Sequence, residues 1–176
     1  ILIYGRQKVE IERYLQRKCD DYVIVRLAKV FGSEYGDGTL FTNWIEAISE
    51  GRHTISCAHD QVFSPIHVED VVNALIGFID TECRGVFHLS SHKPFSRIEL
   101  LKLLLHQLRA RQSVRVDVIP CSIRDFALRE ERPLNVSMIP DKLVNAIGLE
   151  IRDVEDECKT IVREVLDGIN LVRPTS

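Results

Sequence analysis

A tyrosine and a lysine spaced four residues apart, Tyr4 and Lys8, form the pattern in this chain with the clearest potential for chemistry. On a helix such residues share one face. To act as an acid or base near neutrality, a tyrosine needs its pKa lowered by about 3 units, or roughly 4 kcal/mol. An ammonium about 4 Å away supplies that much at an effective dielectric constant of about 20, but only about 1 kcal/mol in water. The pair therefore predicts proton transfer in a sheltered cleft, and an ordinary surface pair elsewhere.

Helices and strands must position this pair. Helical spacing of apolar residues predicts a helix from Tyr4 to Cys19, and a β-branched run predicts a buried strand after it. Ser96 and Glu99 form a capping box at a later helix start. The expected strands are 22–27, 53–57, 62–67, 86–89 and 115–119, the last ended by Pro120, and the other helices are 40–50, 68–80, 96–111, 140–147 and 154–167. Such alternation is typical of an α/β fold.

Composition narrows the class of protein. The chain has 176 residues, 45% of them hydrophobic and 28% charged, which excludes a disordered or fibrous protein. With a net charge of −3 and dispersed basic residues, nucleic acid is not expected as a partner. The five cysteines include no C-x-x-C pair, which indicates reduced thiols and a cytoplasmic protein. Neither a membrane span nor a signal peptide is expected, because the apolar stretches are too short.

The beginning of the chain is unusual for a complete enzyme. It opens on the apolar residue Ile1, and its single methionine is Met138. Neither G-x-x-G-x-x-G nor G-x-G-x-x-G, the turns that cradle a dinucleotide phosphate, occurs in it. We therefore expect an N-terminally truncated chain that begins in the middle of a fold, with the main cofactor-binding motif upstream of it.

Five segments, taken in order, carry a resemblance to a known family. They are YGRQK at 4–8, VIVRLAKVFG at 23–32, FSPIHVEDVV at 63–72, GVFHLS at 85–90 and RPLNVSMIPDKL at 132–143. In this order they resemble the extended short-chain dehydrogenase/reductases that act on nucleotide sugars, in particular the dTDP-4-dehydrorhamnose reductases. The resemblance implies the C-terminal part of a Rossmann-like, doubly wound parallel sheet in 1–119, with segments of a smaller substrate-binding lobe intermixed. It places the rest of that lobe in 120–176.

The resemblance also implies a reaction. Tyr4 would be the general acid/base for the sugar carbonyl, and Lys8 would hold the nicotinamide ribose and lower the pKa of the tyrosine. Both residues would then contact NADP or NAD, which carries the hydride. The substrate would be a nucleotide-linked 4-keto-6-deoxy sugar, and a homodimer is compatible with the family.

Five more residues are candidates for substrate binding by the same resemblance. Lys29 stands where relatives place Asn or Trp, and a cation there would meet a pyrophosphate or sugar oxygen. Asp60 and Gln61 match a D-Q pair that shapes the sugar pocket, although a plain turn explains them equally well. Arg132 would bind the pyrophosphate through its guanidinium, or else lie on the surface. Asn135 belongs to the same segment as Arg132.

Histidines and carboxylates that suggest a metal have another explanation. His67, Glu69 and Asp70 stand at a strand-to-helix junction, where they are expected to cap the helix and interact with its dipole. His88 and His92 have no third ligand nearby in the sequence. No metal site is therefore expected.

Two other functions stay open. The I-H-V-E-D segment at 66–70 also suits a nucleotide-sugar epimerase or dehydratase of the same superfamily, which would retain its oxidised cofactor through turnover. The segment from Phe63 to Asp70 is also similar to that of the β subunit of methionine adenosyltransferase, so a non-catalytic regulatory subunit is the third reading.

Overall fold

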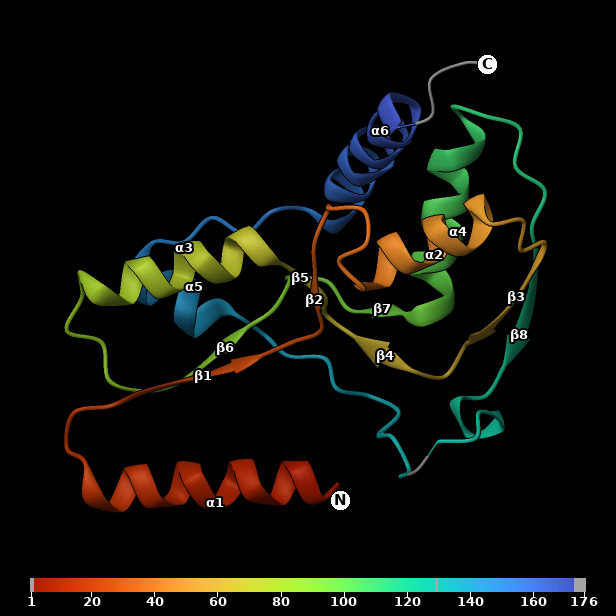
Figure 1. The fold of residues 1–176 in the computed structure, drawn as a ribbon. Coiled ribbons are helices and arrows are strands. Elements are labelled where there is room, and N and C mark those ends of the chain that lie inside the picture. Colours follow the sequence, from red (N-terminus) through yellow and green to blue (C-terminus); the bar gives the residue numbers. More distant parts are fainter. Residues whose placement is uncertain (1, 129, 173–176) are drawn as a thin grey trace.

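The computed structural model describes residues 2–128 and 130–172, which form an α/β protein (Figure 1). The elements in chain order are α1 (Ile3–Lys18), β1 (Val23–Leu27), β2 (Val30–Phe31), α2 (Leu40–Ser49), β3 (Thr54–Ala58), β4 (Val62–Phe63), β5 (Ile66–His67), α3 (Val68–Ile79), β6 (Gly85–Leu89), β7 (Phe95–Ser96), α4 (Arg97–Arg109), β8 (Asp117–Cys121), the 3-10 turn η1 (Ile123–Asp125), α5 (Asp141–Ile147) and α6 (Val154–Val172). The predicted α/β class is confirmed.

The strands pair mostly in parallel. β1 pairs with β6, β2 with β5 and β3 with β8, all in parallel, and β4 pairs with β7 in antiparallel fashion. Each parallel pair joins strands that are distant in sequence, with helices in the intervening chain. This is the expected consequence of parallel pairing, because a parallel neighbour requires a crossover connection.

The structure corrects two details of the predicted strands. The range 62–67 is not one strand, because Ser64 and Pro65 separate β4 from β5 and the two pair with different partners. Pro120 does not end its strand but lies inside β8, opposite Cys57. The Asp117 N–H donates to the His53 carbonyl, and the Cys121 carbonyl accepts from the His59 N–H, so both residues direct their backbone groups toward β3. Because successive residues of a strand alternate in direction, the nitrogen of Pro120 points away from β3. A proline is tolerated there because no hydrogen bond to β3 is lost.

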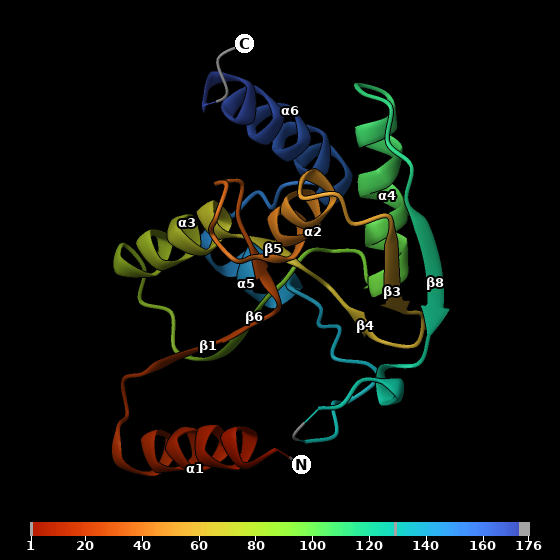
Figure 2. The same cartoon turned by 45° about the vertical axis from the view of Figure 1, so that its right-hand side comes forward.

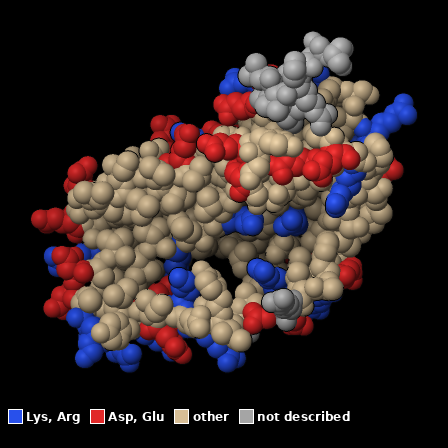
Figure 3. Space-filling model, in the orientation of Figure 1, with Lys and Arg blue, Asp and Glu red and all other residues tan. Residues whose placement is uncertain are grey.

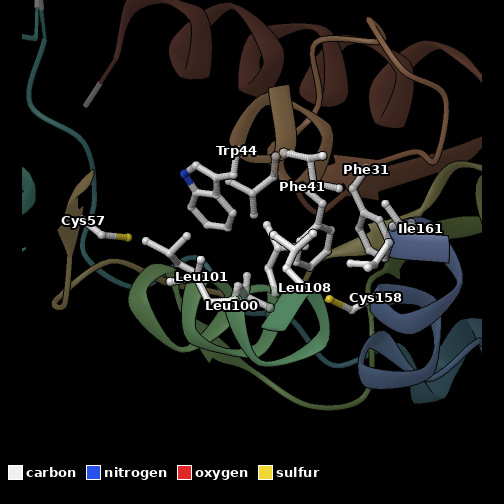
Figure 4. Close-up of a cluster of buried hydrophobic side chains, with 14 of the residues drawn as sticks. Phe31, Phe41, Trp44, Cys57, Leu100, Leu101, Leu108, Cys158 and Ile161 are labelled. Atoms are coloured by element: carbon white, nitrogen blue, oxygen red, sulfur yellow. The ribbon is translucent and has the colours of Figure 1, made fainter. Parts of the chain in front are cut away.

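The core consists of two hydrophobic clusters. The large cluster lies between α2, α4, α6 and β3, and Figure 4 shows Phe41, Leu101 and Ile161 pointing into it from three of these helices. The small cluster packs α3 and α5 against β6. Its buried members are Ile66, Ala74, Phe87, Leu89 and Leu143.

An ion network links α3, in the small cluster, to α6, in the large one. Arg152, just before α6, places its guanidinium nitrogens 2.5 Å from Glu69, 3.3 Å from Asp70 and 3.5 Å from Glu157. His67 caps α3 by accepting the N–H of Glu69 at 3.3 Å, as predicted, and its Nδ1 lies 3.2 Å from Arg152. These five residues are called the Arg152 network below. Asp70 is only 1% exposed, so Arg152 balances a buried charge.

Helix α1 lies apart from the other helices in both ribbon views (Figures 1 and 2). None of its side chains is buried. It is held to β1 by Glu12, whose two carboxylate oxygens accept from Arg26 at 3.0 and 2.6 Å. A surface ion pair thus attaches α1 to the rest of the molecule, whereas the other helices are attached by apolar packing.

Candidate functional site

Tyr4 and Lys8 share one face of α1, as their spacing predicts. The ammonium of Lys8 lies over the Tyr4 ring, 5.3 Å from its centroid, which is the geometry of a cation–π contact. Tyr4 is 66% exposed. The described residues therefore bring the pair together without supplying the shelter that a lowered tyrosine pKa requires. The acid/base role of Tyr4 and the cofactor role of Lys8 stay predictions.

Tyr4 faces a hollow that also contains Arg132. The hollow has a volume of about 570 Å³, and its lining is Leu2, Tyr4, Ala127, Leu128, Glu130 and Arg132. A second hollow of about 180 Å³ adjoins it through Arg132 and extends to η1. Two predicted site residues from opposite parts of the sequence thus meet in one place.

The segment that carries Arg132 is anchored to β4. The Val62 N–H donates to the Leu134 carbonyl at 2.7 Å, and the Val136 N–H donates to the Val62 carbonyl at 2.9 Å. The side-chain oxygen of Asn135 accepts from the N–H and the hydroxyl of Ser137, at 2.9 and 2.7 Å. Asn135 therefore shapes the segment, with its oxygen already bonded to its own chain.

Asp60 and Gln61 make hydrogen bonds to neighbouring segments of the chain. Asp60 accepts from the Ser122 hydroxyl at 2.6 Å and from the Ile123 N–H at 2.8 Å, which ties η1 to the end of β3. These hydrogen bonds, that of Ser122 first, hold the pKa of Asp60 below its ordinary value. The Gln61 carbonyl accepts from the Arg97 N–H at 2.9 Å. The Gln61 Oε1 atom is buried and finds no hydrogen-bond partner in the described part of the chain.

Lys29 lies between β1 and β2, where its carbonyl accepts from the Ile66 N–H at 3.0 Å. Loss of solvent lowers the pKa of the Lys29 ammonium, and the positive charges of Arg97 and Arg132 lower it further. Lys29, Arg97 and Arg132 are together called the basic trio below. Figure 3 shows lysine and arginine side chains gathered around the hollow in the middle of this face.

Arg97 is the member of the basic trio that sequence reasoning missed. It is the first residue of α4, and its guanidinium lies 5.5 Å from the centroid of the Trp44 ring. One signal was available, because a cation at the N-terminus of a helix opposes the helix dipole and needs another reason to be there. Its partner Trp44, on α2, could not be deduced from local patterns.

Among residues 2–128 and 130–172, no cluster of three or more His, Cys, Asp or Glu side chains is arranged to hold a metal ion. Within the same residues, none of the helices combines the length and the apolar character needed to cross a membrane.

Parallel strand pairs with helical crossovers, and a hollow where a tyrosine meets an arginine, define an α/β protein of the Rossmann-like reductase and epimerase class. Comparison with known proteins makes the assignment specific. The chain belongs to the family described as the RmlD substrate binding domain, whose model matches residues 1–166.

The curated relatives include an enzyme subunit and several reductases. The chain is 24% identical to methionine adenosyltransferase 2 subunit beta of Danio rerio over 155 residues, which are 85% of this chain and 47% of that protein. It is 26% identical to dTDP-4-dehydrorhamnose reductase of Mycolicibacterium smegmatis over 171 residues, or 94% of this chain and 51% of that one. The chain therefore spans about half the length of the curated relatives it matches.

Solved structures agree on the fold. The dTDP-4-dehydrorhamnose reductase of Bacillus anthracis, in complex with NADP, has a TM-score of 0.73 and 26% identity, covering 94% of this chain and 55% of that one. UDP-glucose 4-epimerase of Thermotoga maritima, with UDP-glucose, has a TM-score of 0.70 at 21% identity, covering 94% of this chain and 54% of that one.

Proposed function

We propose that this chain is the substrate-binding part of an NAD(P)-dependent reductase that acts on a nucleotide-linked 4-keto-6-deoxy sugar. The observation that carries the proposal is the hollow that brings Tyr4 beside Arg132. A proton donor next to an arginine suits a substrate with a reactive carbonyl and an anionic linker. Family membership supports the same substrate class.

In this proposal Tyr4 donates its phenolic proton to the carbonyl oxygen of the sugar as that carbon is reduced. Lys8, on the same face of α1, favours the phenolate that remains. The open face of α1 leaves room for a nicotinamide ribose at Lys8, so these residues fit that end of NADP or NAD. When bound, the cofactor supplies the hydride. Substrate and cofactor together would exclude water from Tyr4, which the described residues alone do not do.

The remaining candidates have supporting roles in this proposal. Arg132 and Lys29 bind the diphosphate, while Asp60 and Asn135 hold the walls of the hollow in place through their bonds to η1 and to Ser137. Gln61 offers its unpartnered Oε1 to a ligand hydroxyl. The division into 1–119 and 120–176 stays a prediction. A cytoplasmic setting is proposed because all five cysteines are free thiols.

The test is an assay of the protein expressed from its full reading frame, with nucleotide-linked 4-keto sugars as substrates and NADPH oxidation as the readout. Tyr4→Phe should lower turnover by orders of magnitude and leave nucleotide binding nearly unchanged, because it removes only the proton donor. Tyr14→Phe, on the same exposed helix, is the matched control. Equal turnover of the Tyr4→Phe variant and the parent protein would remove the acid/base assignment.

A regulatory subunit is the second candidate, favoured by the match to methionine adenosyltransferase 2 subunit beta over 85% of this chain. The same assay separates the functions. A regulatory subunit would bind the nucleotide without consuming NADPH and would co-purify with a larger catalytic protein. An epimerase or dehydratase would convert the sugar with no net consumption of NADPH.

A further inference from the structure

We propose that the Arg152 network is a pH-sensitive junction, in which Glu157 takes up a proton as the pH falls and thereby strengthens the contact between α3 and α6. The network joins the two hydrophobic clusters, so its charge state affects how firmly they are held together. It shares no residue with the lining of the hollow at Tyr4, and it does not depend on the proposed reaction.

The network contains more negative charge than its arginine balances. The guanidinium of Arg152 faces three carboxylates, at 2.5 Å from Glu69, 3.3 Å from Asp70 and 3.5 Å from Glu157. Three carboxylates against one guanidinium leave an excess of two negative charges when the His67 ring is neutral. Two of the carboxylates belong to α3 and one to α6, so part of the repulsion acts across the contact between these helices.

The geometry around His67 directs a further proton to a carboxylate. The Nδ1 atom of His67 accepts the Glu69 N–H at 3.3 Å and lies 3.2 Å from a guanidinium nitrogen of Arg152, so the hydrogen of the neutral ring is on Nε2. Nε2 is buried, has no hydrogen-bond partner in the described part of the chain, and lies 4.0 Å from a carboxylate oxygen of Glu157. A second proton on the ring would have to bind Nδ1, where it would meet two N–H donors.

Among the three carboxylates, Glu157 has the surroundings that most favour a proton. Glu69 is exposed to water. Burial raises the pKa of Asp70, but its carboxylate accepts the Arg152 backbone N–H at 3.3 Å, which favours the charged form. The side chain of Glu157 is 18% exposed and accepts no hydrogen bond from the residues that the structure describes. Burial raises its pKa, and the charges of Asp70 and Glu69 add to this, against the opposite effects of His67 and Arg152.

Acid should therefore strengthen this junction, whereas it weakens an ordinary ion pair. A carboxylate whose pKa is raised in the folded chain contributes stability below its ordinary pKa, and this contribution is lost as the pH rises through the raised value. At neutral pH the charged Glu157 repels Asp70 and Glu69. When Glu157 is protonated, this repulsion ends, and Arg152 keeps its contacts with the two carboxylates of α3.

Glu157→Gln, which imitates the protonated side chain, tests the proposal in the 176-residue chain. Near about pH 7.5 its thermal unfolding midpoint should lie about 2–4 °C above that of the parent chain, because a partly desolvated charge is removed. The difference should shrink toward zero as the pH falls to about 4.5, because the parent chain then carries the proton itself. Glu164→Gln, at an exposed carboxylate on the same helix, is the matched control and should show no such gain.

Carbon-13 shifts of the side-chain carboxyl groups measure the titration directly in the folded parent chain. The Glu157 carboxyl should titrate about 1 pH unit or more above the Glu164 carboxyl. An unchanged or lowered unfolding midpoint of Glu157→Gln at neutral pH would overturn the proposal, because a supporting ion pair would give that result. A Glu157 titration midpoint at or below that of Glu164 would overturn it as well.

Discussion

The helices of the large cluster bury their apolar side chains, whereas helices α1 and α3 leave most of theirs exposed. Helix α4 buries six of its residues, and α2 buries five. Helix α1 buries none of its residues. Helix α3 buries two, Asp70 and Ala74, of which only Ala74 is apolar. The large apolar residues exposed on α3 are Val68, Val72, Leu75, Ile76 and Ile79. Their helical spacing places them on one face, away from the small cluster.

This difference means that the residues proposed to bind substrate and the residue proposed to transfer the proton are held in place by different parts of the structure. Two members of the basic trio are tied to well-packed parts of the chain, since Arg97 lies on Trp44 and Arg132 lies in a segment bonded to β4. The tyrosine that would transfer the proton lies on a helix with no buried side chain. The proposed anion site can therefore keep its geometry independently of the proposed catalytic pair, whereas acid–base chemistry at Tyr4 would depend on what covers α1.

The same truncation in the two regions should give the largest contrast. Leu104→Ala, at a side chain with 0% exposure in the large cluster, should cost about 2–5 kcal/mol of unfolding free energy through lost contacts and a cavity. Leu75→Ala on α3, at a residue with 52% exposure, should change it by less than about 0.5 kcal/mol. Urea denaturation of both variants measures this. Similar losses at the two sites would show that the α3 face is covered in solution.

The Arg152 network should give the next largest effect, because it joins the two regions. Arg152→Ala leaves Asp70 buried without its cation, and we expect a loss of about 2–3 kcal/mol, reduced from the fully buried case because Arg152 is partly exposed. Arg163→Ala, whose partner Glu164 is exposed, is the control and should cost less than about 0.5 kcal/mol. Thermal or urea unfolding is the measurement. Equal losses for the two variants would mean that the network does not couple the clusters.

The attachment of α1 should respond least and should depend on pH. The hydrogen bond from Arg26 holds the pKa of Glu12 below its ordinary value, so the stabilisation is complete above about pH 4.5 and is lost as the pH falls through the lowered value. Glu12→Gln should cost less than about 1 kcal/mol at neutral pH. Amide chemical shifts of α1 and β1 report the attachment. When the pH is lowered, the amide shifts of the parent chain should move toward those of the Glu12→Gln variant. If they do not, this role for Glu12 is contradicted.

Local patterns were sufficient for much of the fold. The capping box at Ser96 forms as predicted, with the Glu99 carboxylate accepting the Ser96 N–H at 2.6 Å. The helices follow from apolar periodicity because that signal lies within each segment. The two-residue strands β2 and β7 were not predicted, because such short pairings depend on a partner from a distant part of the chain.

The candidate site was predictable only in part, for the same reason. Tyr4 and Lys8 were found through their spacing and Arg132 through a family motif, and the structure places Tyr4 and Arg132 in one hollow. Asp60 was expected to shape a pocket, but its bonds to Ser122 and Ile123 could not be seen in the sequence. Arg97 belongs to no motif, and its contact with Trp44 arises only when α2 packs beside α4.

Pro120 has a consequence for how the protein behaves in a crowded solution. Its nitrogen, turned away from β3, carries no hydrogen to offer to a strand that approaches from outside. A foreign strand aligned along β8 would miss a donor in the middle of the pairing and would meet the bulk of the ring. The residue that looks like a flaw in this strand thus discourages edge-to-edge aggregation at β8.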